Sequence, residues 1–157
     1  MSSSVLVSLR VGASPRRAFD AFVNEIGTWW RPNMLFRFTT PGHGTLAFEP
    51  GPGGRLTQTG PRGEVFEIGR ITVWEPGARL AFTWRQATFS PPQLTQVEVR
   101  FEQAGDHTRV TVEHQGWDTV PQEHAARHGF PDRVFLQRHA EWWQALLASY
   151  ARRLRAH

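Results

Sequence analysis

The stretch "EVFEIGRITVWEPGARLAFTW", residues 64–84, decides the fold. β-Branched and aromatic residues dominate both of its halves, and the turn residues "EPG" at 75–77 separate them. This pattern predicts a β-hairpin made of one long and one shorter strand. In the second strand, Leu80, Phe82 and Trp84 fall on the same face because side chains alternate along a strand. That face is expected to be buried.

Similar segments flank this hairpin on both sides. Before it lie "TLAFEP" and "RLTQTG", and after it lie "TQVEVRFEQ" and "RVTVEHQGW". The connections are mostly short turns, so the six segments between residues 45 and 116 predict an antiparallel meander. Glu98, Arg100 and Arg109 occupy alternate positions, so the other face of the sheet is expected to be wet. A strand follows the glycine-rich "GPGGR", which favours a hairpin turn over a phosphate-binding loop.

A strand and a helical segment precede the meander, and a long helix follows it. Apolar residues alternate over residues 5–11, which predicts an opening strand. Ser14 and Pro15 suit the N-cap and first position of a helix, which Gly27 is expected to interrupt. Residues 132–155 predict a long helix whose apolar stripe lies against the sheet.

Bulk composition indicates a globular chain with a real core. The chain has 157 residues, of which 39% are hydrophobic and 20% charged, and we expect a single domain over residues 1–157. It has no cysteine, which excludes disulfides, thiolate metal sites and cysteine nucleophiles. No stretch approaches the roughly 18 apolar residues of a membrane span, and no signal peptide is evident. We therefore expect a cytoplasmic location.

The sequence pI of about 11.1 overstates how basic the chain is. The formal net charge is only +4, and all 18 basic residues are Arg. Because the chain has no Lys or Cys and one Tyr, almost nothing titrates between neutrality and the pKa of Arg. The Arg residues are spread along the chain, so we expect no nucleic-acid partner.

Motifs for conventional catalysis are missing from the sequence. There is no G-x-S-x-G, and Ser90 and Ser149 have no evident histidine and acid partners. His124 and His128 stand one helical turn apart in "HAARH", but no Glu lies between them and their surroundings are polar. We therefore expect neither a metal site nor a cofactor, and a conventional hydrolase is not favoured.

Several segments carry a family resemblance. They are "SPRRAFDAFVNEIGTWWRP", "GPGGRLTQTG", "GEVFEIGRITVWEPGARLAFTW", "TQVEVRFEQAGDHTRVTVEHQGW" and "WWQALL". Through them the chain resembles, over about residues 5–154, the activator of Hsp90 ATPase homologue-like family of the START-related, Bet v 1-like superfamily. The resemblance implies an α+β helix-grip fold, in which a curved antiparallel sheet of about seven strands surrounds a long C-terminal helix and two short helices follow the first strand. It also implies a cavity between sheet and helix for apolar or amphipathic small molecules.

Two tryptophan pairs, Trp29–Trp30 and Trp142–Trp143, bear on where such a cavity would lie. Neighbouring helical side chains point about 100° apart, so one core cannot easily take both rings from one side. We expect one ring of each pair in the core and the other, Trp30 or Trp143, at the pocket. The alternative that all four simply fill a large core stays open. The expected ligand-binding residues are Trp30, Phe36, Phe66, Phe82, Trp84, Val99, His114, Trp117, Phe135, His139 and Trp143.

His114 and His139 interrupt the apolar faces of the last strand and the last helix. Both imidazoles are therefore expected to point inward. One interpretation is structural, with each ring bonded to backbone or water. The other is functional, with the rings orienting a polar group of a ligand or acting as acid and base on it.

Three hypotheses for function follow. The leading one is binding of a small hydrophobic or aromatic molecule, lipid-like or polyketide-like, without conventional catalysis. The second is a cyclase- or aromatase-like enzyme in which His114 or His139 moves a proton. The third is a co-chaperone-like module that binds a chaperone through Arg85, Arg100 or Arg109 on the wet face of the sheet. The sequence leaves open whether the chain is a monomer or a homodimer.

Overall fold

The computed structural model describes residues 4–29, 45–59, 63, 65–84, 95–115 and 132–155. Within these ranges the chain forms seven strands and three helices. In chain order they are β1 Ser4–Val11, α1 Pro15–Asn24, α2 Ile26–Trp29, β2 Thr45–Phe48, β3 Arg55–Thr59, β4 Val65–Glu75, β5 Arg79–Trp84, β6 Thr95–Ala104, β7 His107–Gln115 and α3 Asp132–Arg155. The predicted α+β helix-grip fold is confirmed, and α3 has the predicted bounds.

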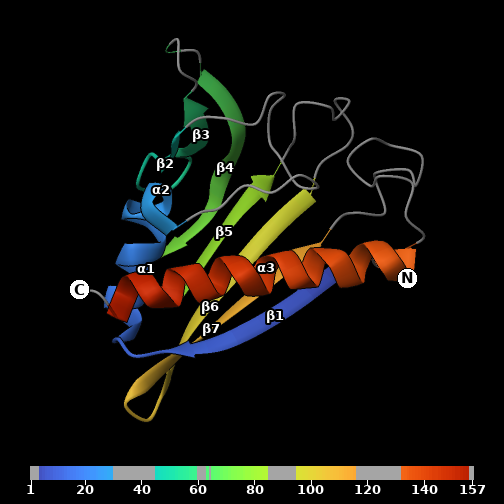
Figure 1. Ribbon diagram of the computed structural model, residues 1–157. Helices are drawn as coiled ribbons and strands as arrows, with labels where there is room; N and C mark the ends of the chain where they lie inside the picture. The colour runs from blue at the N-terminus through green and yellow to red at the C-terminus, as the bar shows by residue number, and fades with distance from the viewer. Residues whose placement is uncertain are drawn as a thin grey trace.

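All seven strands belong to one antiparallel sheet in the order β1-β7-β6-β5-β4-β3-β2. From β2 to β7 each strand pairs with its sequence neighbour, which confirms the meander. The opening strand β1 pairs with the last strand β7, and Val5 lies opposite His114. Figure 1 shows the sheet curving strongly from β1 to β2.

Turns and close backbone contacts shape this curve. The "GPGG" run forms the hairpin between β2 and β3, as predicted, and the backbones of Gly53 and Gly54 hydrogen-bond to Ile71 of β4. Further along β4, the register with β5 shifts between Ile71 and Val73. At Gly69 the backbone lies so close to β5 that a Cβ atom would come within 1.7 Å of the Thr83 carbonyl oxygen. Glycine therefore permits the tight approach that bends β4 over β5.

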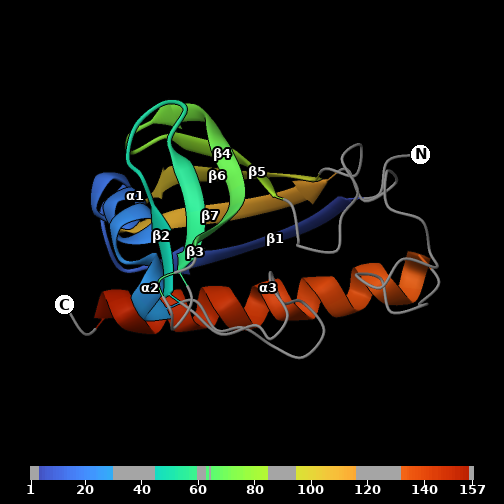
Figure 2. The same ribbon diagram turned by 90° about the horizontal axis from the view of Figure 1, so that it is seen from above.

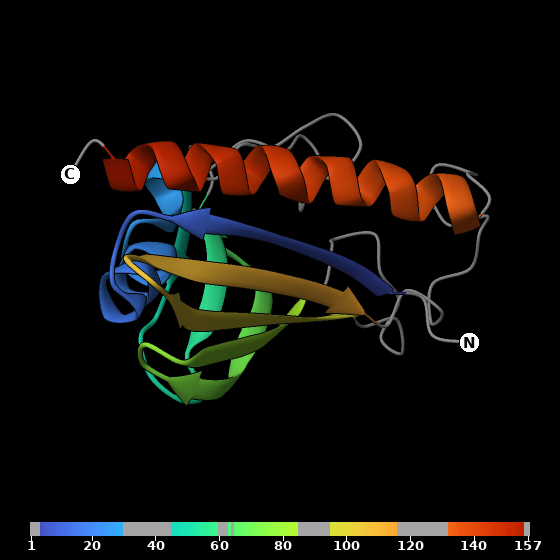
Figure 3. The same cartoon turned by 90° about the horizontal axis from the view of Figure 1, so that it is seen from below.

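Helix α3 covers the inner face of the sheet and runs alongside β1, as the two turned views show (Figures 2 and 3). Its buried side chains include Trp142, Trp143, Leu146, Leu147 and Tyr150. They meet the buried residues of the strands in one hydrophobic core. The predicted apolar stripe of the last helix is thus confirmed in the part whose side chains are described.

Helices α1 and α2 form a corner near the C-terminal end of α3 (Figure 1). Ser14 caps α1 as predicted, because its hydroxyl accepts a hydrogen bond from the Arg17 amide. The predicted interruption at Gly27 is wrong: Gly27 lies inside α2, and the break is at Glu25. The Glu25 amide still bonds to Ala21, and its carbonyl begins the next turn by accepting from the Thr28 amide.

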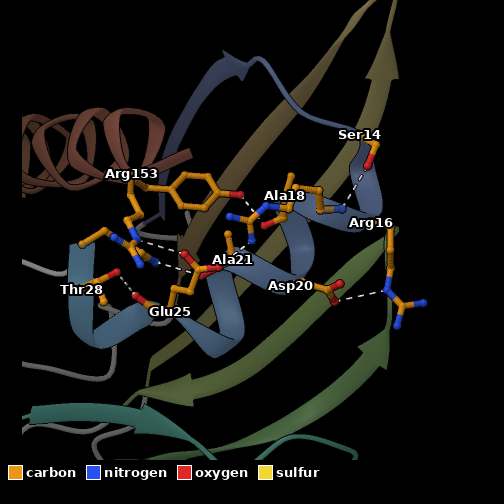
Figure 4. Close-up of polar contacts among 11 residues, drawn as sticks. Ser14, Arg16, Ala18, Asp20, Ala21, Glu25, Thr28 and Arg153 are labelled. Atoms are coloured by element: carbon orange, nitrogen blue, oxygen red, sulfur yellow. Dashed lines mark hydrogen bonds and ion pairs between the residues drawn. The ribbon is translucent and has the colours of Figure 1, made fainter. Parts of the chain in front are cut away.

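The Glu25 side chain ties this corner to α3 (Figure 4). Its carboxylate binds Arg17 of α1 and, at 3.1 Å, Arg153 of α3. The hydrogen bond from Arg17 is the main cause that lowers the pKa of Glu25 below its usual value, and Arg153 adds to it. Beside this ion pair, the Tyr150 hydroxyl donates to the carbonyl of Ala18.

Candidate functional site

Aromatic and polar side chains from four elements meet where the sheet faces the middle of α3. Trp84 ends β5, Thr95 begins β6, His114 lies near the end of β7, and Trp142 and Trp143 come from α3. We call these five residues the tryptophan–histidine cluster. Strand register brings the first three together, because Trp84 lies opposite Thr95 and His114 is the neighbour of Val97 on the same face.

The rings of the cluster pack against one another at interplanar angles between 49° and 90°. The centroid of the Trp84 ring lies 4.8 Å from that of His114, 5.4 Å from Trp142 and 5.9 Å from Trp143. Trp84 and Trp142 are perpendicular, which is a favoured arrangement for aromatic pairs. All four rings are buried, and His114 is 0% exposed. The cluster therefore holds a large apolar surface around one imidazole.

Hydrogen bonds fix the protonation state of His114. The indole N–H of Trp143 points at Nδ1 of His114 at 3.2 Å. An indole N–H can only donate, so Nδ1 must accept and carries no proton. The neutral ring then holds its proton on Nε2 and donates it to Oγ1 of Thr95, 2.8 Å away. The Thr95 hydroxyl in turn donates to the carbonyl of Trp84 at 3.0 Å.

These hydrogen bonds decide which contacts the cluster can make with a ligand. Each polar hydrogen of Trp143, His114 and Thr95 has an acceptor inside the cluster. Both nitrogens of His114 are therefore engaged, and the ring is neutral. The arrangement suits contact with an apolar or aromatic partner, whereas proton transfer by His114 would first require one of these bonds to break.

The structure brings part of the predicted ligand-binding set together. Trp84, His114 and Trp143 lie in the cluster, and Phe82 and Val99 are buried on the same face of the sheet. Phe82 packs against Phe48 with ring centroids 5.1 Å apart, and Phe66 is partly buried against the core. The other predicted residues fall outside the described residues or side chains; they are Trp30, Phe36, Trp117, Phe135 and His139. The same holds for Arg85, Ser90, His124 and His128.

Three of the four paired tryptophans have described side chains, and all three are buried. Trp29 is a core residue as expected, since it is 0% exposed, donates to the Ala21 carbonyl and packs on Tyr150. In the second pair both rings are buried, with Trp142 at 4% and Trp143 at 0% exposure. Both indoles reach Trp84 because the curved sheet faces more than one side of α3. The expected division into one core ring and one ring at the pocket stays a prediction for this pair.

Sequence analysis missed two members of the cluster. Thr95 was not singled out, although it links His114 to the backbone of β5. Its only signal is its place at the start of a strand, opposite Trp84 in a meander register. Trp142 was assigned to the core alone, although it contacts both Trp84 and Trp143.

Two further classes of site can be judged within the described ranges. There, no group of three or more His, Cys, Asp or Glu side chains is placed to hold a metal ion. No helix in these ranges combines the length and the apolar character that crossing a membrane requires.

Solved structures share this architecture. Protein MLL2253 from Mesorhizobium loti is 18% identical, with a TM-score of 0.66 over 95% of this chain and 94% of that one. The Aha1 dimer from Colwellia psychrerythraea is 15% identical, with a TM-score of 0.64 over 96% and 95%. A third, described as the anthrahydroquino-gamma-pyrone synthase Txn09 complexed with SUM, is 28% identical, with a TM-score of 0.57 over 95% of each chain.

Among curated proteins, none matches this chain. The model of one family does match, over residues 12–151, and its description is "Activator of Hsp90 ATPase homolog 1-like protein". This match covers most of the sequence and includes both helices of the corner, six of the seven strands and most of α3. The chain therefore belongs to the family of activator of Hsp90 ATPase homolog 1-like proteins.

Proposed function

We propose that this protein binds a small hydrophobic, aromatic molecule between the inner face of the sheet and α3, without conventional catalysis. The observation that carries the proposal is the tryptophan–histidine cluster, in which three indoles and a neutral imidazole converge from β5, β7 and α3. Indole faces stack on flat ligands and contribute a large contact area. Phe82 and Val99 extend this apolar surface along the sheet.

Family membership and one relative support the proposal. The family resemblance implies a cavity between the sheet and the C-terminal helix, which is where the cluster lies. The synthase Txn09, 28% identical over 95% of the chain, is described as an anthrahydroquino-gamma-pyrone synthase complexed with SUM. The proposal also includes the predicted residues whose side chains the structure does not describe, Trp30, Phe36, Trp117, Phe135 and His139.

Native mass spectrometry of the protein purified from its own host tests the proposal first. We expect a retained apolar compound, which is then extracted, identified and titrated against tryptophan fluorescence. Binding should weaken by about tenfold or more in Trp143→Phe, because the ring is trimmed and its N–H no longer holds His114. Trp74→Phe is the matched control, since Trp74 packs on Phe19 away from the cluster.

Two results would overturn the proposal. One is a protein that retains no compound and whose tryptophan fluorescence does not change when a broad panel of lipids and aromatic polyketides is added. The other is binding that Trp143→Phe and Trp84→Phe leave unchanged although both variants remain folded by circular dichroism. Either result would make the cluster a core feature only.

A second candidate is a polyketide cyclase-like enzyme, favoured by the relation to the synthase Txn09. In that case the bound molecule would be converted, and His114 would have to release Trp143 or Thr95 to move a proton. Turnover of the retained compound or its precursor would then fall by about a hundredfold or more in His114→Gln. Full turnover in that variant would remove His114 from any catalytic role.

A further inference from the structure

We infer that the site takes an uncharged aromatic ligand and excludes anionic analogues of the same shape. This inference rests on the proposed function, because it names the class of molecule that the same site accepts. It follows from how charge is distributed between the inside and the outside of the described structure.

No ionic side chain is buried among those that the structure describes. The buried polar residues are all uncharged in the state that their hydrogen bonds define; they are Thr57, Gln58, Thr95, Thr108, Thr111, His114 and Ser149. Every Asp, Glu and Arg of known burial is exposed or half-buried instead. On the part of the inner face that these described side chains form, an anion would therefore meet no cation.

Among the described residues, the buried titratable groups His114 and Tyr150 are also neutral. Nδ1 of His114 accepts a hydrogen bond from the Trp143 N–H. A second proton on the ring would sit on Nδ1 and point at this N–H, so that two donors would face each other. Tyr150 donates its proton to the Ala18 carbonyl, and burial raises the pKa of its hydroxyl. Neither group supplies a positive charge to balance an anion.

Three of the hydrogen-bond donors of the cluster are not available to an anion. The polar hydrogens of Trp143, His114 and Thr95 already have acceptors within the cluster. The faces of the indole rings are negative, so they repel an anion that stacks on them. Removing an ionised group from water without a partner is costly, and the anionic form should therefore stay outside.

The Arg side chains on the outer surface do not supply a cation for an anion bound on the inner face. On the wet face of the sheet, Glu98 lies 3.8 Å from Arg79 and 3.7 Å from Arg100. At the corner, Glu25 binds Arg17 and Arg153. These guanidinium groups already face carboxylates, and a surface contact with them would differ from binding on the inner face.

A matched pair of fluorescent probes tests the inference. N-phenylnaphthylamine is neutral, and anilinonaphthalene sulfonate has the same two aromatic parts with a sulfonate added. Titrating each into the full chain, we expect saturable binding of the neutral probe and at least about tenfold weaker binding of the anionic probe. Trp143→Phe should weaken binding of the neutral probe, whereas Trp74→Phe should not.

The outcomes separate the inference from the proposed function. If the anionic probe binds as tightly as the neutral one and loses affinity in Trp143→Phe, the inference is wrong and the proposed function stands. Anionic binding that Trp143→Phe and Trp84→Phe leave unchanged is surface binding and agrees with the inference. If neither probe binds at any concentration up to its solubility limit, the proposed binding site is wrong.

Discussion

His114 shows how a buried polar residue can be fully satisfied in an apolar setting. Its two nitrogens bind one residue of α3 and one of β6, so the ring joins the helix to the sheet. Removing one partner leaves a buried donor without an acceptor, which typically costs more than the bond itself contributes. A substitution that keeps the shape of a cluster side chain but removes its hydrogen-bonding group is therefore expected to lower the stability of the protein.

Thr95→Val tests this sensitivity, because valine keeps the shape of threonine and removes the hydroxyl. The Nε2–H of His114 then loses its acceptor, and we expect the free energy of unfolding to fall by about 1–3 kcal/mol in urea denaturation. Thr72→Val, at an exposed position of β4, is the control and should change stability by no more than about 0.5 kcal/mol. Equal stability of Thr95→Val and the parent would contradict the assigned tautomer.

At the residue level, the sequence revealed the direction of side chains better than their partners. Alternation along the strands correctly predicted that Trp84 and His114 point inward. The partner of His114 depends on the register between β6 and β7 and on the rotation of α3, neither of which is local in sequence. Thr95 could not be recognised for the same reason, since a threonine at a strand end is ordinary by itself.

Among the elements, β4 depends on the close contact of Gly69 with β5. In Gly69→Ala the new Cβ would lie 1.7 Å from the Thr83 oxygen, and both atoms belong to rigid parts of the sheet. We expect a loss of about 3 kcal/mol in thermal or chemical unfolding, since β4 and β5 would have to separate. Gly12→Ala is the control, because no atom lies within 4 Å of its new Cβ. Equal effects of the two changes would contradict this account of the sheet's curvature.

The corner of α1 and α2 is held to α3 through Glu25, and Glu25→Gln tests that contact. Because the two ion pairs are only half-buried, we expect a loss of about 1 kcal/mol at neutral pH. Arg17 and Arg153 lower the pKa of Glu25, so this stabilisation is present above the usual carboxyl pKa and is lost as pH falls through the folded-state value. The difference between parent and variant should therefore shrink in acid.

Asp20→Asn is the control for Glu25→Gln. Asp20 pairs with Arg16 one helical turn away, with both side chains largely exposed, so its effect should stay near a few tenths of a kcal/mol. If Asp20→Asn lowers the free energy of unfolding as much as Glu25→Gln, the ion pairs of Glu25 stabilise the protein no more than an exposed ion pair does.

The elements themselves were largely predictable from local pattern. Periodicity located α3 and the meander, because an apolar stripe and an alternating strand are each readable within a few residues. The break before α2 was placed at Gly27, although the chain turns at Glu25, whose side chain is held by a residue of α3. The pairing of β1 with β7 was not predicted from the sequence, since about a hundred residues separate the two strands.

At the scale of the whole molecule, the charged side chains of known burial lie on the outside, while the described interior relies on neutral hydrogen bonds and packing. On the outside, hydrogen bonds from Arg55 lower the pKa of Glu49 to about 2, although both side chains remain accessible to solvent. Such exposed pairs contribute little to stability. The core, by contrast, contains the single tyrosine of the chain, Tyr150, packed between Phe22 and Trp29.

Alkaline unfolding should therefore be governed by this one phenol. Burial raises the pKa of Tyr150 above its ordinary value of 10.0, so below about pH 10 both the folded and the unfolded chain keep the proton and stability is unaffected. At higher pH the unfolded chain releases the proton and the folded chain does not, so the free energy of unfolding falls by up to about 1.4 kcal/mol per pH unit. Because the chain has no Lys and no Cys, few other side chains titrate in this range.

Two spectra recorded over the same alkaline titration check this expectation. Tyrosinate absorbance should rise together with the loss of the circular dichroism signal, not before it. Tyr150→Phe keeps the ring but loses the bond to Ala18, so it should be about 1 kcal/mol less stable at neutral pH and show a flatter decline above pH 10. Tyrosinate that forms near pH 10 in a chain with intact circular dichroism would show that Tyr150 is open to solvent. The contact between α3 and the α1 corner would then be looser than the structure describes.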